Sequence, residues 1–206
     1  LTILHQTMGC RKYKDVTPKI AKAAYEEWVS RGVSFANHTA TCASRVYNYA
    51  IQMEHAEQNP FTKIKRKRNQ QRKVVWTHGE VNKFLDVAYS DFEYRNLGLI
   101  VHMAYEWAQR VGDMRTLTWD NINFSAQRVD LTQSKRGADV HLPIPDDLLS
   151  MLRQQSQDFG FQDYVAPKTT PVAGAYVPYA IDHIDDAINE VKEAAGLPKK
   201  LTAMDL

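Results

Sequence analysis

The chain has 206 residues, of which 44% are hydrophobic and 24% are charged, and its formal net charge at pH 7 is +2. This composition is typical of a globular protein with one large or two small domains, and it excludes the disordered and fibrous classes. No apolar run approaches the about 18 residues of a membrane span, and the first residues lack the pattern of a signal peptide. We therefore expect no membrane partner. Because the sequence starts with Leu1 rather than methionine, we expect a fragment.

The two cysteines and the scattered histidines predict neither a metal site nor a cofactor. Cys10 and Cys42 are too few for a disulfide framework, so we expect both to be buried in a reducing cytoplasm. We expect no metal site around His38 or His55.

Residues 1–62 are predicted to form an all-helical domain. Thr17 is a typical N-cap, proline follows it at the first helical position, and Gly32 is a typical end for that helix. A second helix is predicted from Ser34 or Asn37 to about residue 58. The apolar residues that follow helical spacing on it, and that we expect to be buried, are Cys42, Val46, Ala50 and Met53.

The opposite face of this second helix carries short polar groups and one cation. Its residues are Asn37, His38, Thr41, Arg45 and Asn48. Polar outer faces are the rule for surface helices, so a solvated face accounts for this pattern. The same groups also suit a helix that lies in a DNA groove and meets phosphates and base edges. Both interpretations stay open on the residues alone.

A strongly basic segment follows, and we interpret residues 63–76 as a linker between two domains. Seven cations and no acid occur in it, and they are Lys63, Lys65, Arg66, Lys67, Arg68, Arg72 and Lys73. A run of like charges repels itself, stays solvated and attracts polyanions, of which nucleic acid is the commonest. The segment therefore predicts a connector that lies along double-stranded DNA, with a steep loss of affinity as salt rises.

Residues 77–206 are predicted to form a second domain with both helices and strands. Thr77 and Glu80 have the spacing of a capping box at the start of its first helix. A core helix from about residue 92 to residue 109 is apolar on one side, and a last helix is predicted from about residue 179 to residue 195. Either a solvated helix face or a metal site accounts for the polar side chains of this last helix, Asp182, His183, Asp185 and Asp186.

A β-hairpin is predicted between these helices. The runs 128–132 and 139–144 are β-like, and a polar loop with Gly137 joins them. Lys135 and Arg136 lie at the tip of this hairpin. Either these cations keep an edge strand from aggregating, or they project from the domain and contact DNA.

Arg110 stands at the end of the apolar core helix, where a guanidinium needs a partner. One interpretation is a local pair with Asp113, worth about 0.2–0.5 kcal/mol if exposed. The other is an arginine placed at a cleft, where its planar fork matches a phosphate.

Several motifs in this order resemble those of one family. They are Arg31-Gly32-Val33-Ser34 with Asn37, Tyr49-Ala50-Ile51, Asn59-Pro60-Phe61, Arg110 with Gly112 and Asp113, Leu117-x-Trp119-x-x-Ile122, Ser134-Lys135-x-Gly137 and Leu142-Pro143-Ile144-Pro145. With them the chain resembles the tyrosine recombinases of the phage integrase family over essentially its whole length. Asp113 stands where the family usually has glutamate, and Met204 stands where many members have a catalytic histidine.

The resemblance implies a mainly α fold with a small antiparallel β hairpin or sheet. A helical core-binding domain (residues 1–62) is joined by the basic linker (63–76) to a catalytic domain (77–206). That last domain would be truncated before the second catalytic arginine and the nucleophilic tyrosine, so we expect this piece to bind DNA without cutting it.

The resemblance also implies a chemistry that uses no cofactor and no metal. In it a tyrosine attacks a DNA phosphate and forms a 3′-phosphotyrosine. Arg110 would stabilise the phosphoryl charge, Lys135 would protonate the 5′ leaving oxygen, and Asp113 would orient Arg110. The implied partners are double-stranded attachment sites and other recombinase protomers in a bacterial cytoplasm, with the isolated fragment a monomer.

Two other functions remain open. One is a DNA-binding relative without catalysis, such as a decayed prophage remnant. The other is a metal-dependent nuclease that uses the region around Asp182.

Overall fold

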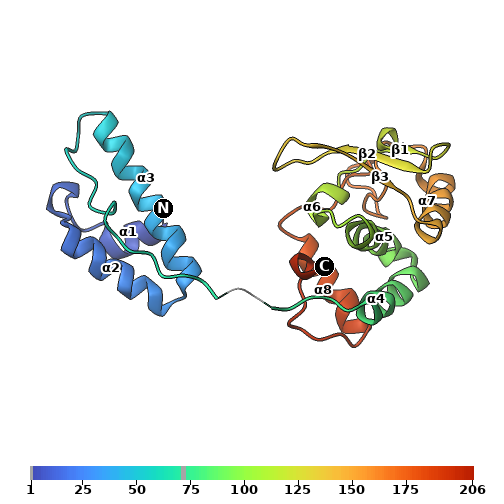
Figure 1. The fold of residues 1–206 in the computed structure, drawn as a ribbon, viewed down its shortest axis with the longest axis horizontal. Coiled ribbons are helices and arrows are strands. Elements are labelled where there is room, and N and C mark those ends of the chain that lie inside the picture. The colour runs from blue at the N-terminus through green and yellow to red at the C-terminus, as the bar shows by residue number, and fades with distance from the viewer. Residues whose placement is uncertain (1, 71–72) are drawn as a thin grey trace. The chain divides into compact units, whose positions relative to one another are not determined.

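The computed structural model describes residues 2–70 and 73–206. It divides into two compact units, Leu1–Arg72 and Lys73–Leu206, and each is described by itself (Figure 1). None of the helices in the described residues is both long and apolar enough to cross a membrane.

The first unit is all-helical, with elements α1 (Thr2–Met8), the 3-10 turn η1 (Tyr13–Asp15), α2 (Pro18–Ser30) and α3 (Val33–Gln52). The side chain of Thr17 caps α2 by accepting a hydrogen bond from the backbone N–H of Ile20, at 3.4 Å. Gly32 adopts a φ of +128° between α2 and α3, a conformation that only glycine takes without strain. Helix α3 ends at Gln52, about 1.7 turns before its predicted end near residue 58.

The core of the first unit lies on a different face of α3 from the predicted one. The small residues Ala36, Thr39, Ala40 and Ala43 are the buried positions of this helix. The predicted apolar face was wrong, because Val46 and Met53 are 46% and 48% exposed. The physical reason is that short side chains let α3 approach the large Trp28 and Tyr25 of α2, so packing volume overrides the hydrophobic pattern.

The cysteines are also placed differently from expectation. Cys10 is exposed and Cys42 is half-buried. The burial expected for them was therefore wrong, since neither faces the core of the first unit. Cys42 lies one helical turn after His38, with its Sγ 3.7 Å from the His38 Nε2.

The described part of the second unit contains five α-helices and two 3-10 turns, which lie before and after a small sheet in the sequence. Its elements are α4 (His78–Ser90), α5 (Phe92–Glu106), α6 (Val111–Met114), η2 (Trp119–Asn121), β1 (Ile122–Asn123), β2 (Arg128–Thr132), β3 (Asp139–Pro143), α7 (Asp146–Phe159), α8 (Ile184–Ala194) and η3 (Ala203–Asp205). The predicted capping box at the start of α4 is present, with reciprocal bonds between Thr77 and Glu80. Strands β1, β2 and β3 form an antiparallel sheet in that order, with Val129 paired to Ile122 and Leu142.

Helix α5 is the centre of the second unit, and its residues from Asn96 to Ala104 are all buried. A buried polar network fastens the loop after α7 to this helix. Gln155 donates to the side-chain oxygen of Asn96 (2.8 Å) and to the carbonyl of Val165 (2.9 Å), while Asn96 donates to the carbonyl of Pro167 (2.8 Å). Buried amides are tolerated here because each finds a partner. The mainly helical fold with a small antiparallel sheet is thus confirmed.

Helix α8 begins at Ile184 rather than near Tyr179, so its predicted start was wrong. The carbonyl of Tyr179 accepts a hydrogen bond from the Arg115 Nη1 at 2.8 Å instead of joining a helical ladder. This tertiary contact with Arg115 therefore keeps Tyr179 out of the helix, which begins later in the sequence than predicted.

Each end of the basic segment packs on its own unit. Phe61 stacks on Trp28 with ring centroids 6.2 Å apart, and the backbone N–H of Lys67 donates to the Tyr25 hydroxyl at 2.7 Å. In the second unit, the Trp76 Nε1 donates to the carbonyl of Thr202 at 2.9 Å. The domain limits 1–62, 63–76 and 77–206 stay a prediction, and the segment between the two anchors is shorter than residues 63–76.

Candidate active site and DNA-binding surface

Arg110 is placed by the way in which helix α5 ends. Ala108 adopts a left-handed conformation with φ of +49°, and the N–H groups of Ala108 and Gln109 return to the carbonyls of Tyr105 (3.3 Å) and Ala104 (3.1 Å). This is the Schellman arrangement, which satisfies the last carbonyls of a helix. The chain then turns at once into α6, with Arg110 at its N-cap. A hydrogen-bonded turn therefore places Arg110 at the surface.

The guanidinium of Arg110 has one nearby acid and remains open to a ligand. Its Nη1 lies 3.6 Å from the Asp113 Oδ2, which is an ion pair but too long for a hydrogen bond. The Arg110 side chain is 44% exposed, whereas that of Asp113 is only 7% exposed. The buried carboxylate attracts and orients the cation while leaving its donors available for an anion. The geometry is thus compatible with both interpretations of Arg110, the local pair with Asp113 and the arginine that binds a phosphate.

Arg115 is a residue of this site that the sequence did not single out. Its bond to the carbonyl of Tyr179 ties the segment before α8 to α6. A Cβ added at Gly112 would lie 3.4 Å from the Ile181 Cδ1, which is an ordinary van der Waals contact, so this approach does not require glycine. Burial, with a smaller contribution from Glu93, raises the pKa of Tyr179 to about 12, so its hydroxyl remains protonated at neutral pH. The cation of Met114-Arg115 was the only signal in the sequence that could have pointed to this contact.

Lys135 and Arg136 are exposed in the loop between β2 and β3, as predicted. The loop is closed by two backbone bonds, from Gln133 N–H to the Ala138 carbonyl (2.9 Å) and from Gly137 N–H to the Gln133 carbonyl (2.8 Å). Its base is joined to the arginine segment, because the Gln133 Nε2 donates to the Gln109 Oε1 at 2.7 Å. The structure therefore brings the base of the lysine loop to the residue that precedes Arg110.

Some residues on the polar face of α3 form hydrogen bonds within the chain. Asn37 accepts a hydrogen bond from the Tyr25 hydroxyl (2.7 Å) and donates to the carbonyl of Lys67 (2.9 Å). The Thr41 hydroxyl donates to the carbonyl of Asn37 at 2.8 Å. His38 and Arg45 are exposed on this face. The amide of Asn37 thus holds the start of the basic segment, whereas His38 and Arg45 face solvent.

The described cations of the basic segment are all exposed, and they are Lys63, Lys65, Arg66, Lys67, Arg68 and Lys73. Arg72 lies outside the described residues. The Lys67 Nζ bonds to the Glu26 carboxylate at 2.7 Å, so this cation already has a partner. The other described cations project a concentrated positive charge into solvent, which attracts polyanions.

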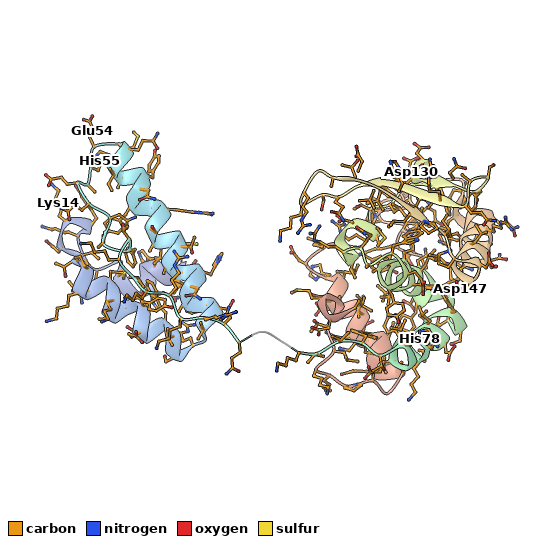
Figure 2. The ribbon with its side chains drawn as sticks, viewed as in Figure 1. Lys14, Glu54, His55, His78, Asp130 and Asp147 are labelled. Carbon is orange, nitrogen blue, oxygen red and sulfur yellow. The ribbon has the colours of Figure 1, made fainter. Side chains whose placement is uncertain are left out.

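One group of potential metal ligands comes together in the part of the chain that the structure describes, and it consists of His102, Glu106 and Asp147. The His102 Nε2 lies 3.4 Å from the Asp147 Oδ2, and its Nδ1 lies 2.9 Å from the Tyr89 hydroxyl (Asp147 is labelled in Figure 2). These contacts already give both ring nitrogens a partner. Among the described residues, the acids around Asp182 do not form such a group, although a single His183–Asp186 pair lies at 3.9 Å.

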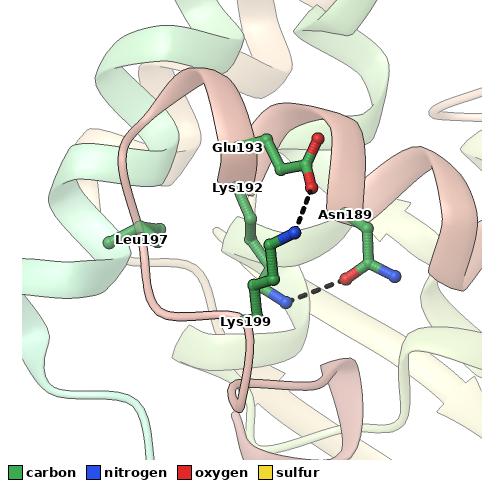
Figure 3. Close-up of a pocket in the computed structure, with 5 residues that line it drawn as sticks. All are labelled: Asn189, Lys192, Glu193, Leu197 and Lys199. Carbon is green, nitrogen blue, oxygen red and sulfur yellow. Dashed lines mark hydrogen bonds and ion pairs between the residues drawn. The ribbon is translucent and has the colours of Figure 1, made fainter.

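A small pocket of about 190 Å³ lies near the C-terminal end of α8 (Figure 3). The buried Lys192 donates to the Asn189 side chain at 2.8 Å and to the carbonyl of Leu201. Burial lowers the pKa of Lys192, and nearby acids oppose this shift. These bonds hold the segment that leads to η3, and the pocket is lined by none of the predicted site residues.

Comparison with known proteins identifies the family. The model of the phage integrase family matches residues 75–206, which include Arg110, Asp113 and Lys135. The chain belongs to this family. No curated protein matches the chain by sequence.

The fold of this phage integrase family member recurs in solved structures of integrases. It superimposes on a lambda integrase dimer bound to a COC′ core site with a TM-score of 0.79 at 20% identity, covering 99% of this chain and 59% of that one. It also matches the Tn1549 transposon integrase in complex with circular intermediate DNA, with a TM-score of 0.71 at 16% identity, covering 99% of this chain and 74% of that one. The chain thus spans about three fifths of the length of the lambda integrase chain, and the likeness shows a shared fold.

Proposed function

We propose that this chain is the core-binding and catalytic region of a site-specific DNA recombinase that integrates DNA through a 3′-phosphotyrosine. The observation that carries the proposal is the placement of Arg110. A hydrogen-bonded helix end places it at the surface beside the buried Asp113, and its neighbour Gln109 bonds to the base of the lysine loop. An exposed, oriented guanidinium linked in this way to a loop with a further exposed cation is an arrangement suited to a phosphodiester.

Each residue of the motif has a separate role in the proposed reaction. Arg110 binds the non-bridging phosphoryl oxygens and stabilises the charge that builds on them. Lys135 donates a proton to the 5′ oxygen as it leaves, so that the departing group is a neutral hydroxyl. Asp113 orients Arg110 and takes no proton. We assign no nucleophilic tyrosine or second arginine within these 206 residues, and we propose that this piece binds DNA without cutting it.

Double-stranded DNA and other protomers are the proposed partners. The basic segment supplies affinity through Lys63, Lys65, Arg66, Arg68, Arg72 and Lys73. Arg136 adds a further cation in the hairpin loop. His38, Thr41 and Arg45 on α3 face the DNA, while Asn37 and Lys67 hold the start of the basic segment in place. The lambda and Tn1549 integrases were solved with DNA, the lambda enzyme as a dimer and as a tetramer, which supports this assignment.

A suicide-substrate assay on the full-length protein tests the proposal. A nicked attachment-site duplex should trap a covalent protein–DNA adduct that resists EDTA. Arg110→Ala should lower the rate of adduct formation about 100- to 1,000-fold, because one charge-stabilising donor is lost. The variant should retain most of its DNA binding. Strong binding without any adduct in the unaltered protein would favour the non-catalytic alternative, and adduct-free cleavage that needs Mg²⁺ would favour the nuclease.

A further inference from the structure

Two side-chain hydrogen bonds join the end of α5 to the β2–β3 hairpin. The Gln133 Nε2 donates to the Gln109 Oε1 at 2.7 Å, and the Trp107 Nε1 donates to the carbonyl of Pro143 at 2.9 Å. The first bond lies at the loop end of the hairpin and the second at its opposite end. The hairpin is therefore held at two points against the segment that carries Arg110.

The bond between the two glutamines is oriented by its surroundings. The Gln109 Nε2 donates to the carbonyl of Trp107 at 2.9 Å, which fixes the amide so that its oxygen faces Gln133. On the other side, the backbone of Gln133 is bonded to Ala138 and Gly137 and so closes the loop. Gln109 immediately precedes Arg110, and Gln133 lies two residues before Lys135. The glutamine pair thus links the residue that precedes Arg110 directly to the base of the lysine loop.

We propose that Gln109 and Gln133 form a positioning pair that sets the distance between the general-acid loop and Arg110. This inference rests on the proposed function and adds a requirement to it. A general acid must come within about 2.6–3.2 Å of the oxygen that it protonates, and a displacement of about 1 Å can cost 100-fold in rate. The loop itself is exposed and has no buried side chain to hold it. The glutamine bond supplies that restraint.

The pair is expected to affect chemistry more than stability. A single neutral hydrogen bond at a half-buried site contributes only a small part of the free energy of folding. Gln133→Met keeps the length of the side chain and removes its hydrogen bonding, and Gln109→Ala breaks the pair from the other side. The matched control is Gln157→Ala, since Gln157 is exposed on α7.

The test measures cleavage by the full-length protein on two substrates. One has a normal phosphodiester, and the other has a 5′-bridging sulfur, whose thiolate leaves without being protonated. We expect Gln133→Met to lower the cleavage rate of the normal substrate about tenfold to 100-fold and to cleave the sulfur substrate at nearly the rate of the unaltered protein. Lys135→Ala should behave in the same way, whereas Arg110→Ala should be slow on both. Equal losses on the two substrates, or no loss on either, would overturn the inference.

A second measurement does not depend on catalysis. Amide hydrogen exchange of residues 134–138 in the 206-residue chain should become faster in Gln133→Met and remain unchanged in Gln157→Ala. Unchanged exchange in Gln133→Met would overturn the positioning role even if the protein recombines DNA. An unaltered full-length protein that forms no adduct would instead overturn the proposed function, together with the catalytic purpose of the pair.

Discussion

The two units hold their candidate functional residues in different ways. In the first unit, His38 and Arg45 project from a helix face and the cations of the basic segment lie on an exposed chain. In the second unit, Arg110 follows a closed helix end, and the lysine loop is bonded to that same end. Attraction to a polyanion depends on the number of charges near it, whereas catalysis depends on their exact geometry. This difference supports the proposal that the first unit supplies affinity and the second unit supplies the chemistry.

The largest effect expected in the first unit comes from removing charge. The variant Lys65→Gln, Arg66→Gln, Arg68→Gln should bind DNA at least about tenfold more weakly and reduce the slope of log K against log salt by about 2 to 3. Salt titrations of DNA binding measure both quantities. If the basic segment is not a DNA contact, the slope will not change.

The control for this variant removes the same number of charges elsewhere. Lys83, Arg153 and Lys199 are exposed in the second unit and outside the basic segment. Their replacement by glutamine should leave the salt slope within about 1 of the original value. An equal change in both variants would mean that only net charge matters.

Variants of Asn37 distinguish two roles for this residue of α3, which are contact with DNA bases and support of the basic segment. If it holds the segment, Asn37→Ala and Tyr25→Phe should each weaken DNA binding by about fivefold, for specific and nonspecific DNA alike. Each variant removes one bond of about 1 kcal/mol to the backbone of Lys67, Asn37→Ala the bond to its carbonyl and Tyr25→Phe the bond from its N–H. If Asn37 contacts a base, only Asn37→Ala will change binding, and it will do so on the specific site alone. Competition assays with both DNAs separate the two outcomes.

The stability of the second unit should depend on pH through His102. Burial is the main reason that the pKa of His102 is lowered, although Asp147 and Glu106 oppose the shift. The unfolded state therefore binds more protons than the folded state between the lowered pKa and about 6.5, so the free energy of unfolding should fall as pH decreases through that window. Thermal melts at pH 7.5 and 5.5 should show this loss in the unaltered protein and a smaller one in His102→Gln. Identical losses would assign the effect to other groups.

The smallest expected effect concerns the turn before Arg110. The left-handed φ of +49° is unfavourable for Ala108 but freely adopted by glycine, so Ala108→Gly should stabilise the second unit by about 0.5–1 kcal/mol. Ala126 is an exposed alanine that is not in this conformation, and Ala126→Gly should bring no gain. Denaturant melts measure both. A destabilised Ala108→Gly would show that the turn is held by something other than backbone preference.

Local signals in the sequence were reliable where a few neighbouring residues decide the outcome. The N-cap at Thr17, the capping box at Thr77 and the exposed hairpin tip at Lys135 all follow from short-range geometry. The proximity of Arg110 to Asp113 does so too, because residues three apart meet on one side of a helical turn.

Predictions failed where distant residues compete for the same surface. The buried face of α3 was misjudged because the bulk of Trp28 and Tyr25 selects alanines and not Val46. The start of α8 was misjudged because Arg115, 64 positions earlier, takes the carbonyl of Tyr179. Hydrophobic periodicity contains no information about either partner.

The sequence by itself determined the hairpin and the presence of the main helices, though not all of their ends. It also determined the concentration of charge in residues 63–76 and the family motifs around Arg110 and Lys135. Only the tertiary structure decided which of these groups remain available to a ligand. The polar groups of Asn37 and Lys67 form contacts within the chain, whereas the donors of Arg110 remain available beside a buried carboxylate. The physical reason is that a polar side chain bonds to whatever the packed chain brings within reach, and that neighbour can lie anywhere in the sequence.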